Sequence, residues 1–261
     1  MTVERDDARP EAFAAEIRAA FRSGDESAAT RMARTEIERA RAAGEPAGEV
    51  ESLYALARVA LRAGDLAQAE ELASAALEVA VRSGDRRLEE RPRHVLAAVA
   101  RLSGDHAEAR TRYLASIALN DQLGQPELGN AEYHNLAFTE LRLGHLDRAR
   151  QLFAEGRDRV FRNCYRDFVP YLGVAAAALA TAEGDHRTAA RMIGFTDRAY
   201  AAIGQVPDPD DAAELAAART AAVAALGEAD FAHAYASGAV LDETGAFGLE
   251  WDVHCSSTAS A

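Results

Sequence analysis

The sequence contains no lysine, since all 29 of its basic residues are arginine. This absence excludes the kinds of site that depend on a lysine, among them the P-loop, the Schiff-base site and the β-lactamase type of site. Long apolar runs are also missing. Because a membrane-spanning helix needs about 18 or more consecutive apolar residues, we expect no membrane span.

Cysteine is scarce, with only Cys164 and Cys255 in the chain. The two fit no closely spaced pair, so we expect two reduced thiols rather than a disulfide framework. The first ten residues carry acids where a signal peptide needs a basic segment followed by an apolar one. We therefore expect a cytoplasmic protein.

Aromatic residues make up 7% of the chain, whereas apolar residues make up 49% and much of that share is alanine. This composition favours closely packed helices over a sheet. The formal net charge is −13, and no block of arginines stands apart from the acids. Such a chain should repel nucleic acid, so we expect no direct nucleic-acid binding.

Glycine recurs at a fixed spacing that organises most of the chain. One series steps by 40 residues, and a second series lies halfway between its members. The two series are Gly24, Gly64, Gly104, Gly144 and Gly184, and Gly44, Gly84, Gly124 and Gly204. Position 164 is the missing member of the second series and is occupied by Cys164. A turn is therefore predicted about every twenty residues.

Residues around each turn indicate helical hairpins. Glycine suits the left-handed position that ends a helix, and the aspartate that often follows it, as in Gly64-Asp65, suits the N-cap of the next helix. Apolar residues between the turns follow helical spacing, as from Leu53 to Leu61. Alanine stands five residues after each glycine of the first series, where a small side chain lets helices approach closely.

The pattern of Leu136-Ala137, Gly144, Ala149 and Phe153 resembles the tetratricopeptide repeat family. The resemblance extends over residues 10–203, with repeat units beginning near 10, 50, 90, 130 and 170. It implies an all-α, right-handed superhelical array of about six helix-turn-helix repeats with a period of 40 residues. A period of this length also fits HEAT or armadillo arrays, but the glycine-to-alanine spacing argues against them.

The predicted domain organisation has three parts. Residues 1–9 form an N-terminal tail, residues 10–245 form the repeat domain, and residues 246–261 form a flexible tail. The last hairpin, residues 210–243, is expected to be atypical because it closes the array. Asp211 and Glu214 read as a capping box that opens its first helix.

The C-terminal part, with Gly194, Gly204, Gly227, Phe231 and Gly238, is similar to the tetratricopeptide-like sensor region of large actinobacterial transcriptional regulators. The ATPase motif and the DNA-binding motif of those proteins are not found. The similarity implies a detached regulatory or scaffold module.

Motifs for chemistry are scarce. The seven histidines show no metal-ligand spacing, and no nucleophile motif is recognisable. We therefore predict no metal site, no cofactor and no enzymatic activity, although an enzyme assembled from distant residues remains an alternative.

The resemblance places a ligand groove on the first helices of the repeats. Counting positions from each glycine gives the candidate lining residues Tyr54, Arg58, Arg62, Arg91, His94, Arg101, His134, Asn135, Phe138, Arg142 and Tyr171. Arginine forks bind carboxylates, asparagine pairs with peptide backbone, and aromatic rings anchor apolar side chains. The prediction is a protein- or peptide-binding scaffold with a regulatory role, whose partner has an acidic or C-terminal segment. The family's carboxylate clamp needs lysines that this chain lacks.

Three alternatives stay open. The same groove could bind a small-molecule effector in a pocket between Tyr54, His94 and Phe138. The partly apolar Tyr54 and Phe138 could instead belong to the core, with the arginines paired to neighbouring glutamates. The end of the array could also serve self-association, and the sequence leaves the oligomeric state open.

Overall fold

The computed structural model describes residues 8–22, 24–125, 128–252 and 255, and it is built from helices throughout these ranges. The chain divides into two compact units, unit 1 over residues 1–125 and unit 2 over residues 126–261. The predicted all-α repeat array is therefore confirmed. The single repeat domain expected over residues 10–245 stays a prediction.

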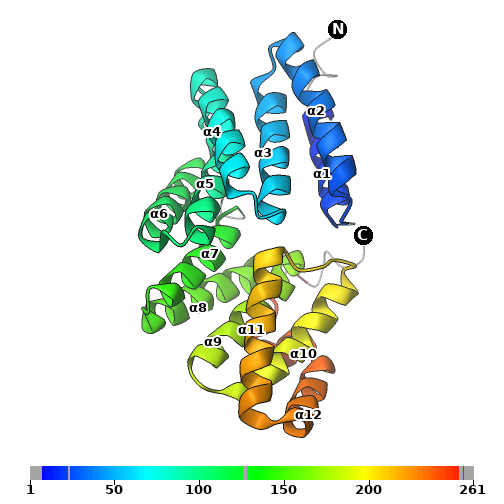
Figure 1. Cartoon of the computed structure of the whole chain (residues 1–261), viewed down its shortest axis with the longest axis vertical. Coiled ribbons are helices and arrows are strands. Elements are labelled where there is room, and N and C mark those ends of the chain that lie inside the picture. The colour runs from blue at the N-terminus through cyan, green and yellow to red at the C-terminus, as the bar shows by residue number, and fades with distance from the viewer. Residues whose placement is uncertain (1–7, 23, 126–127, 253–254, 256–261) are drawn as a thin grey trace. The chain divides into compact units, whose positions relative to one another are not determined.

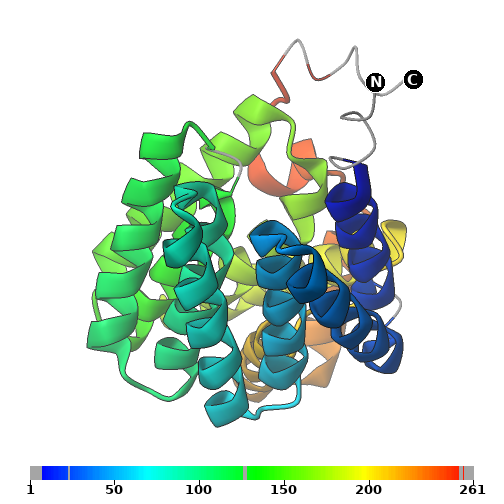
Figure 2. The ribbon, with the colours of Figure 1, turned by 90° about the horizontal axis from the view of Figure 1, so that it is seen from above.

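Unit 1 consists of three successive helix pairs. Neighbouring helices run side by side and are joined by tight turns (Figures 1 and 2). The elements are α1 (Ala8–Arg22), α2 (Glu26–Ala43), α3 (Pro46–Arg62), α4 (Leu66–Ser83), the 3-10 turn η1 (Arg86–Glu89), α5 (Glu90–Leu102) and α6 (His106–Leu123). Each pair begins close to the predicted repeat starts at 10, 50 and 90.

Unit 2 continues with two further pairs and then departs from the pattern (Figure 1). Its elements are α7 (Gly129–Arg142), α8 (Leu146–Asn163), the 3-10 turn η2 (Arg166–Phe168), α9 (Val169–Ala182), α10 (His186–Ala202), α11 (Pro209–Leu226), α12 (Glu228–Ala239) and the short α13 (Glu243–Phe247).

The glycine turns have the predicted geometry. Every glycine of both series has a positive φ, which a residue with a Cβ adopts only at a cost. Cys164, the non-glycine member, adopts the same conformation with a φ of 62°. The side chains of Asp25, Asp65, Asp105 and Asp185 each accept a hydrogen bond from the backbone N–H three residues later, so these four are N-caps as predicted. Asp85 differs, because it caps the 3-10 turn η1 instead of an α-helix.

Alanines at the predicted small positions lie in the core of each unit. Ala69, Ala109, Ala149 and Ala189 are all fully buried. A buried alanine leaves no gap only where a neighbouring helix comes close, so these positions set the tight packing of each pair.

The last two long helices do not form the expected hairpin, because α12 packs mainly on α10 and much less on α11. Two glycines allow this contact. A Cβ on Gly194 of α10 would lie 2.1 Å from the Tyr235 carbonyl oxygen, and one on Gly238 of α12 would lie 1.7 Å from that of Arg191. The backbones of α10 and α12 therefore touch where both residues lack a side chain.

Cys164 and Cys255 form a disulfide with a Cα–Cα distance of 5.4 Å. The two reduced thiols expected from the sequence were wrong. The pairing was hidden because 91 residues separate the two positions, and only the return of the chain past the end of α8 brings them together.

The C-terminal segment places two aromatic rings on unit 2. We call residues 243–252 together with Cys255 the C-terminal strap. The Phe247 ring lies 5.8 Å from the Phe161 ring and 5.3 Å from the Phe195 ring, while Trp251 stacks on Phe161 at 4.4 Å. These contacts fall within residues 246–261, for which the flexible tail stays a prediction. Part of that range and most of the predicted tail over 1–9 lie outside the described residues.

None of the described helices combines the length and the apolar character that crossing a bilayer requires.

Candidate functional site

On unit 1, the predicted groove residues Tyr54 and Arg58 of α3 and Arg91 of α5 form one cluster. The Arg91 guanidinium lies 5.2 Å from the centre of the Tyr54 ring, and that of Arg58 lies 4.2 Å from the Phe21 ring and 5.9 Å from Tyr54. Tyr54 and Arg58 share a face because they are four residues apart on one helix. The Tyr54 side chain is partly exposed, whereas burial of its hydroxyl raises the pKa.

Two ion pairs on this face, made by Arg91 and Arg62, link one repeat to the next. Arg91 pairs with Glu51, exactly one 40-residue period earlier in the sequence. Arg62 donates from Nε to Glu26 at 2.9 Å, and its side chain is 14% exposed. These pairs agree with the alternative in which glutamates neutralise the arginines, and they hold the guanidinium groups at the surface of unit 1.

The other two predicted residues of unit 1 lie on α5. His94 is partly buried, and Arg101 is 9% exposed and so belongs mostly to the interior. We therefore define the first-helix face of unit 1 as Tyr54, Arg58, Arg62, Arg91 and His94.

On unit 2, the predicted residues His134, Phe138 and Tyr171 are brought together, but in an aromatic cluster. The His134 ring centre lies 4.9 Å from that of Phe138 and 5.9 Å from that of Tyr171. Tyr171 stacks on Phe168 at 4.8 Å and is partly buried. Phe138 is 2% exposed and His134 is 8% exposed, so both rings belong to the core of unit 2.

The helix α11 covers this cluster with acidic side chains. Asp211 Oδ1 lies 3.2 Å from His134 Nε2, and both residues are buried. Three residues later, Glu214 accepts a hydrogen bond from Arg142, whose side chain is largely exposed. The remaining predicted residue, Asn135, is partly buried. One face of α11 thus binds two of the predicted groove residues.

The environment of Asp211 is unusual for a carboxylate. Burial raises its pKa, and the hydrogen bond from His134 counteracts only part of that effect. This placement corrects the predicted capping box, because α11 begins at Pro209 and Asp208 stands at its N-cap position. Asp211 points into the core of unit 2 instead, since α11 approaches α7 from outside the repeat pattern.

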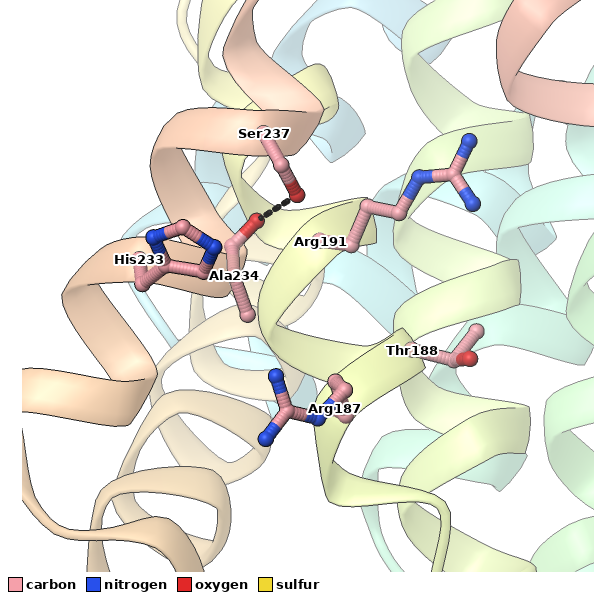
Figure 3. A pocket seen from close by; sticks show the side chains of 6 residues that line it. All are labelled: Arg187, Thr188, Arg191, His233, Ala234 and Ser237. Atoms are coloured by element: carbon pink, nitrogen blue, oxygen red, sulfur yellow. Dashed lines mark hydrogen bonds between the residues drawn. The ribbon is translucent and has the colours of Figure 1, made fainter.

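A shallow pocket of about 220 Å³ lies between α10 and α12, away from the predicted residues. Its lining consists of Arg187, Thr188, Arg191, His233, Ala234 and Ser237. Figure 3 shows that the Arg191 guanidinium extends away from the His233 ring, so these polar groups do not converge on one point. The Ser237 hydroxyl is used within α12, where it donates to the Ala234 carbonyl at 2.6 Å.

Within the part of the chain that the structure describes, no group of three or more His, Cys, Asp or Glu side chains is arranged to hold a metal ion. The predictions of no cofactor and no enzymatic activity stay predictions.

Comparison with known families matches residues 49–122 to a tetratricopeptide repeat model. Among solved structures, the crystal structure of BtubC (BKLC) from P. vanneervenii has a similar fold, with a TM-score of 0.52 and 22% sequence identity, over 81% of this chain and 87% of that one. No match is found among curated proteins. The tetratricopeptide-like fold is thereby confirmed, while the similarity of the C-terminal part to actinobacterial regulators stays a prediction.

Proposed function

We propose that this tetratricopeptide-like scaffold binds an acidic segment of a partner protein on the first-helix face of unit 1. The observation that carries the proposal is the docking of α11 on unit 2. There, Asp211 contacts His134 and Glu214 contacts Arg142. Repeat counting assigned both His134 and Arg142 to ligand binding. Counted back from their glycines, Tyr54 and Arg62 stand at the same two positions in unit 1.

The arginines of unit 1 can accept a ligand carboxylate while keeping their own glutamates. A guanidinium has five N–H donors in a planar fork and can bridge two carboxylates. Such bridges occur among the described residues, where Arg39 contacts both Glu36 and Glu45, and Arg150 contacts both Asp147 and Glu183. We expect Arg62 and Arg91 to bridge a ligand carboxylate and their present partners in the same way.

Tyr54 supplies the apolar part of the proposed site. Its ring is partly exposed and lies next to the guanidinium groups of Arg58 and Arg91. An aromatic ring held between two cations loses little conformational entropy on binding, which is the property of an interface anchor. The proposed ligand therefore places an apolar side chain next to its carboxylates.

The cytoplasmic location and the regulatory role belong to the same proposal and rest on the sequence arguments given above. The small-molecule alternative requires Tyr54 and His94 of unit 1 together with Phe138 of unit 2, and Phe138 is 2% exposed in the core of unit 2.

The proposal is tested with an array of 15-residue helical peptides that carry Asp-x-x-Glu, beside matched peptides that carry Asn-x-x-Gln. We expect the wild-type protein to bind members of the acidic set. The Arg62→Ala/Arg91→Ala variant should lose that binding with an unchanged helical circular dichroism spectrum. Arg142→Ala, which removes an exposed arginine of unit 2, is the matched control and should bind as the wild type does. Equal binding to both peptide sets, or equal loss in the control, would refute the proposed site.

A further inference from the structure

The disulfide joins a turn of the repeat array to the C-terminal strap. Cys164 occupies the left-handed position directly after α8 and is partly buried. Cys255 is fully buried, and its sulfur lies 3.7 Å from the Phe161 carbonyl oxygen. An approaching thiolate therefore has better access to the Cys164 end of the bond.

Two aromatic residues of the strap contact the helices beneath it, since Phe247 meets the Phe161 and Phe195 rings and Trp251 stacks on Phe161. Trp251 lies between the Phe161 ring, at 4.4 Å, and the Arg166 guanidinium, at 4.3 Å. The Gly245 carbonyl accepts a hydrogen bond of 3.3 Å from Arg191. Beneath the strap, Phe161 is 3% exposed and Phe195 is fully buried.

The helix inside the strap is too short to be stable on its own. It spans only five residues, Glu243–Phe247, whereas isolated helices shorter than about 12 residues are marginal in water. The chain fixes the strap at its start, after α12, and the disulfide fixes it at its far end, at Cys255. Cleavage of the disulfide frees the far end and leaves the ring contacts of Phe247 and Trp251 as the remaining anchors.

We propose that Cys164–Cys255 is a reversible thiol–disulfide site, at which a protein or small-molecule dithiol releases the C-terminal strap and uncovers the Phe161 ring. This inference is independent of the proposed peptide face on unit 1.

The exchange proceeds in two steps. A thiolate of the dithiol attacks the Cys164 sulfur, forms a mixed disulfide and expels Cys255 as a thiolate, which then takes up a proton. The second thiol of the reagent loses its proton and attacks the reagent's other sulfur, which is bonded to Cys164 in the mixed disulfide. This attack closes the reagent's own disulfide and expels Cys164 as a thiolate. Cys164 then takes up a proton as well. The protein disulfide gains two electrons and two protons, and the reagent leaves as its own disulfide.

Trp251 is the only tryptophan of the chain, so its fluorescence reports on the strap alone. We expect the air-oxidised protein to show no titratable thiol and the protein treated with dithiothreitol to show two. On reduction, the emission of Trp251 should shift to longer wavelength and its quenching by iodide should increase. The far-ultraviolet circular dichroism should stay nearly unchanged, because the strap contains one short helix.

The matched control is the Cys164→Ser/Cys255→Ser variant. It should show the emission of the reduced state from the start and no response to dithiothreitol. If this variant does not fold, reduced wild-type protein alkylated with iodoacetamide replaces it and should keep the shifted emission after the reductant is removed. The proposal is overturned if the air-oxidised protein has two free thiols, if reduction leaves emission and quenching unchanged, or if the control responds to dithiothreitol as the wild type does.

Discussion

Unit 1 and unit 2 are built from the same repeat, yet they treat equivalent positions differently. Tyr54 and His134 both stand ten residues before the turn glycine of their repeats. In unit 1, Tyr54 is partly exposed between two arginines, whereas in unit 2, His134 is buried beneath Asp211 of α11. The repeat therefore fixes where a side chain stands, and a helix from outside the repeat decides whether that side chain becomes surface or core.

The difference has a simple physical origin. A segment that belongs to the same chain meets its docking face at a high effective concentration, so α11 needs only modest contacts to stay in place. Unit 1 has no equivalent of α11 among its described elements, and its arginines pair with glutamates of adjacent repeats instead. This contrast makes unit 1 the better candidate for an external acidic partner.

The largest expected effect comes from substitution at one repeat position in both units, six residues before the glycine. Phe138→Ala should lower the free energy of unfolding of unit 2 by about 3–5 kcal/mol, because it leaves a cavity in a buried aromatic cluster. Arg58→Ala should cost about 0.5–1 kcal/mol, the value of an exposed cation–π contact. Urea unfolding of the two variants measures the two losses of unfolding free energy. Similar losses would show that the two faces do not differ as described.

A second large effect is expected where α10 and α12 touch. In Gly238→Ala the new Cβ would meet the Arg191 backbone, so α12 must shift, at a cost of about 1–3 kcal/mol or more. Gly156→Ala on α8 is the matched control. Its Cβ has its nearest neighbour 3.8 Å away, and it should stabilise its helix by about 0.5–1 kcal/mol. Melting temperatures that move in opposite directions would support the close backbone contact, and a shift in the same direction would contradict it.

The regular part of the fold could be predicted because its signals are local or periodic. The turn at Gly64, the cap at Asp65 and the buried Ala69 all lie within five residues of one another. The pair of Glu51 and Arg91 spans one period, so counting along the repeat relates the two residues even though they are distant in sequence.

The long-range contacts of unit 2 could not be predicted, because they depend on where the last helices pack against the repeats. Asp211 meets His134 across 77 residues, and Cys255 meets Cys164 across 91 residues. Neither separation is a multiple of the period. The capping interpretation of Asp211 used only the next three residues, while burial in unit 2 decided its actual role. Of the candidate site, the sequence predicted the positions but not which of them α11 would cover.

The pH dependence of unit 2 tests the burial of Asp211. Because burial raises the pKa of Asp211 in the folded state, the folded protein binds this proton more tightly than the unfolded chain does. The resulting stability is fully present below the unfolded pKa of about 3.9 and is lost as the pH rises through the folded value. Asp211→Asn removes this contribution, so the wild type should gain stability relative to the variant as the pH falls from neutral towards 4.

Urea unfolding of both proteins at several pH values measures that difference. Asp230→Asn, which changes an exposed aspartate of α12, is the control and should leave the pH dependence of the wild type nearly intact. A difference between the wild type and Asp211→Asn that stays constant with pH would mean that Asp211 is solvated in solution. In that case α11 would not cover His134, and the contrast between the two units would disappear.

The smallest expected effect concerns the arginine that stands two residues before the glycine in both units. Arg62→Ala breaks the pair with Glu26, and Arg142→Ala breaks the pair with Glu214. Each should cost about 0.2–1 kcal/mol of stability, the range of partly exposed ion pairs, and added salt should reduce the cost. The two variants should therefore be equally stable and differ only in acidic-peptide binding. A large loss of stability in Arg62→Ala alone would mean that this arginine serves the fold of unit 1, which would leave Tyr54 and Arg91 as the remaining basis for a peptide site.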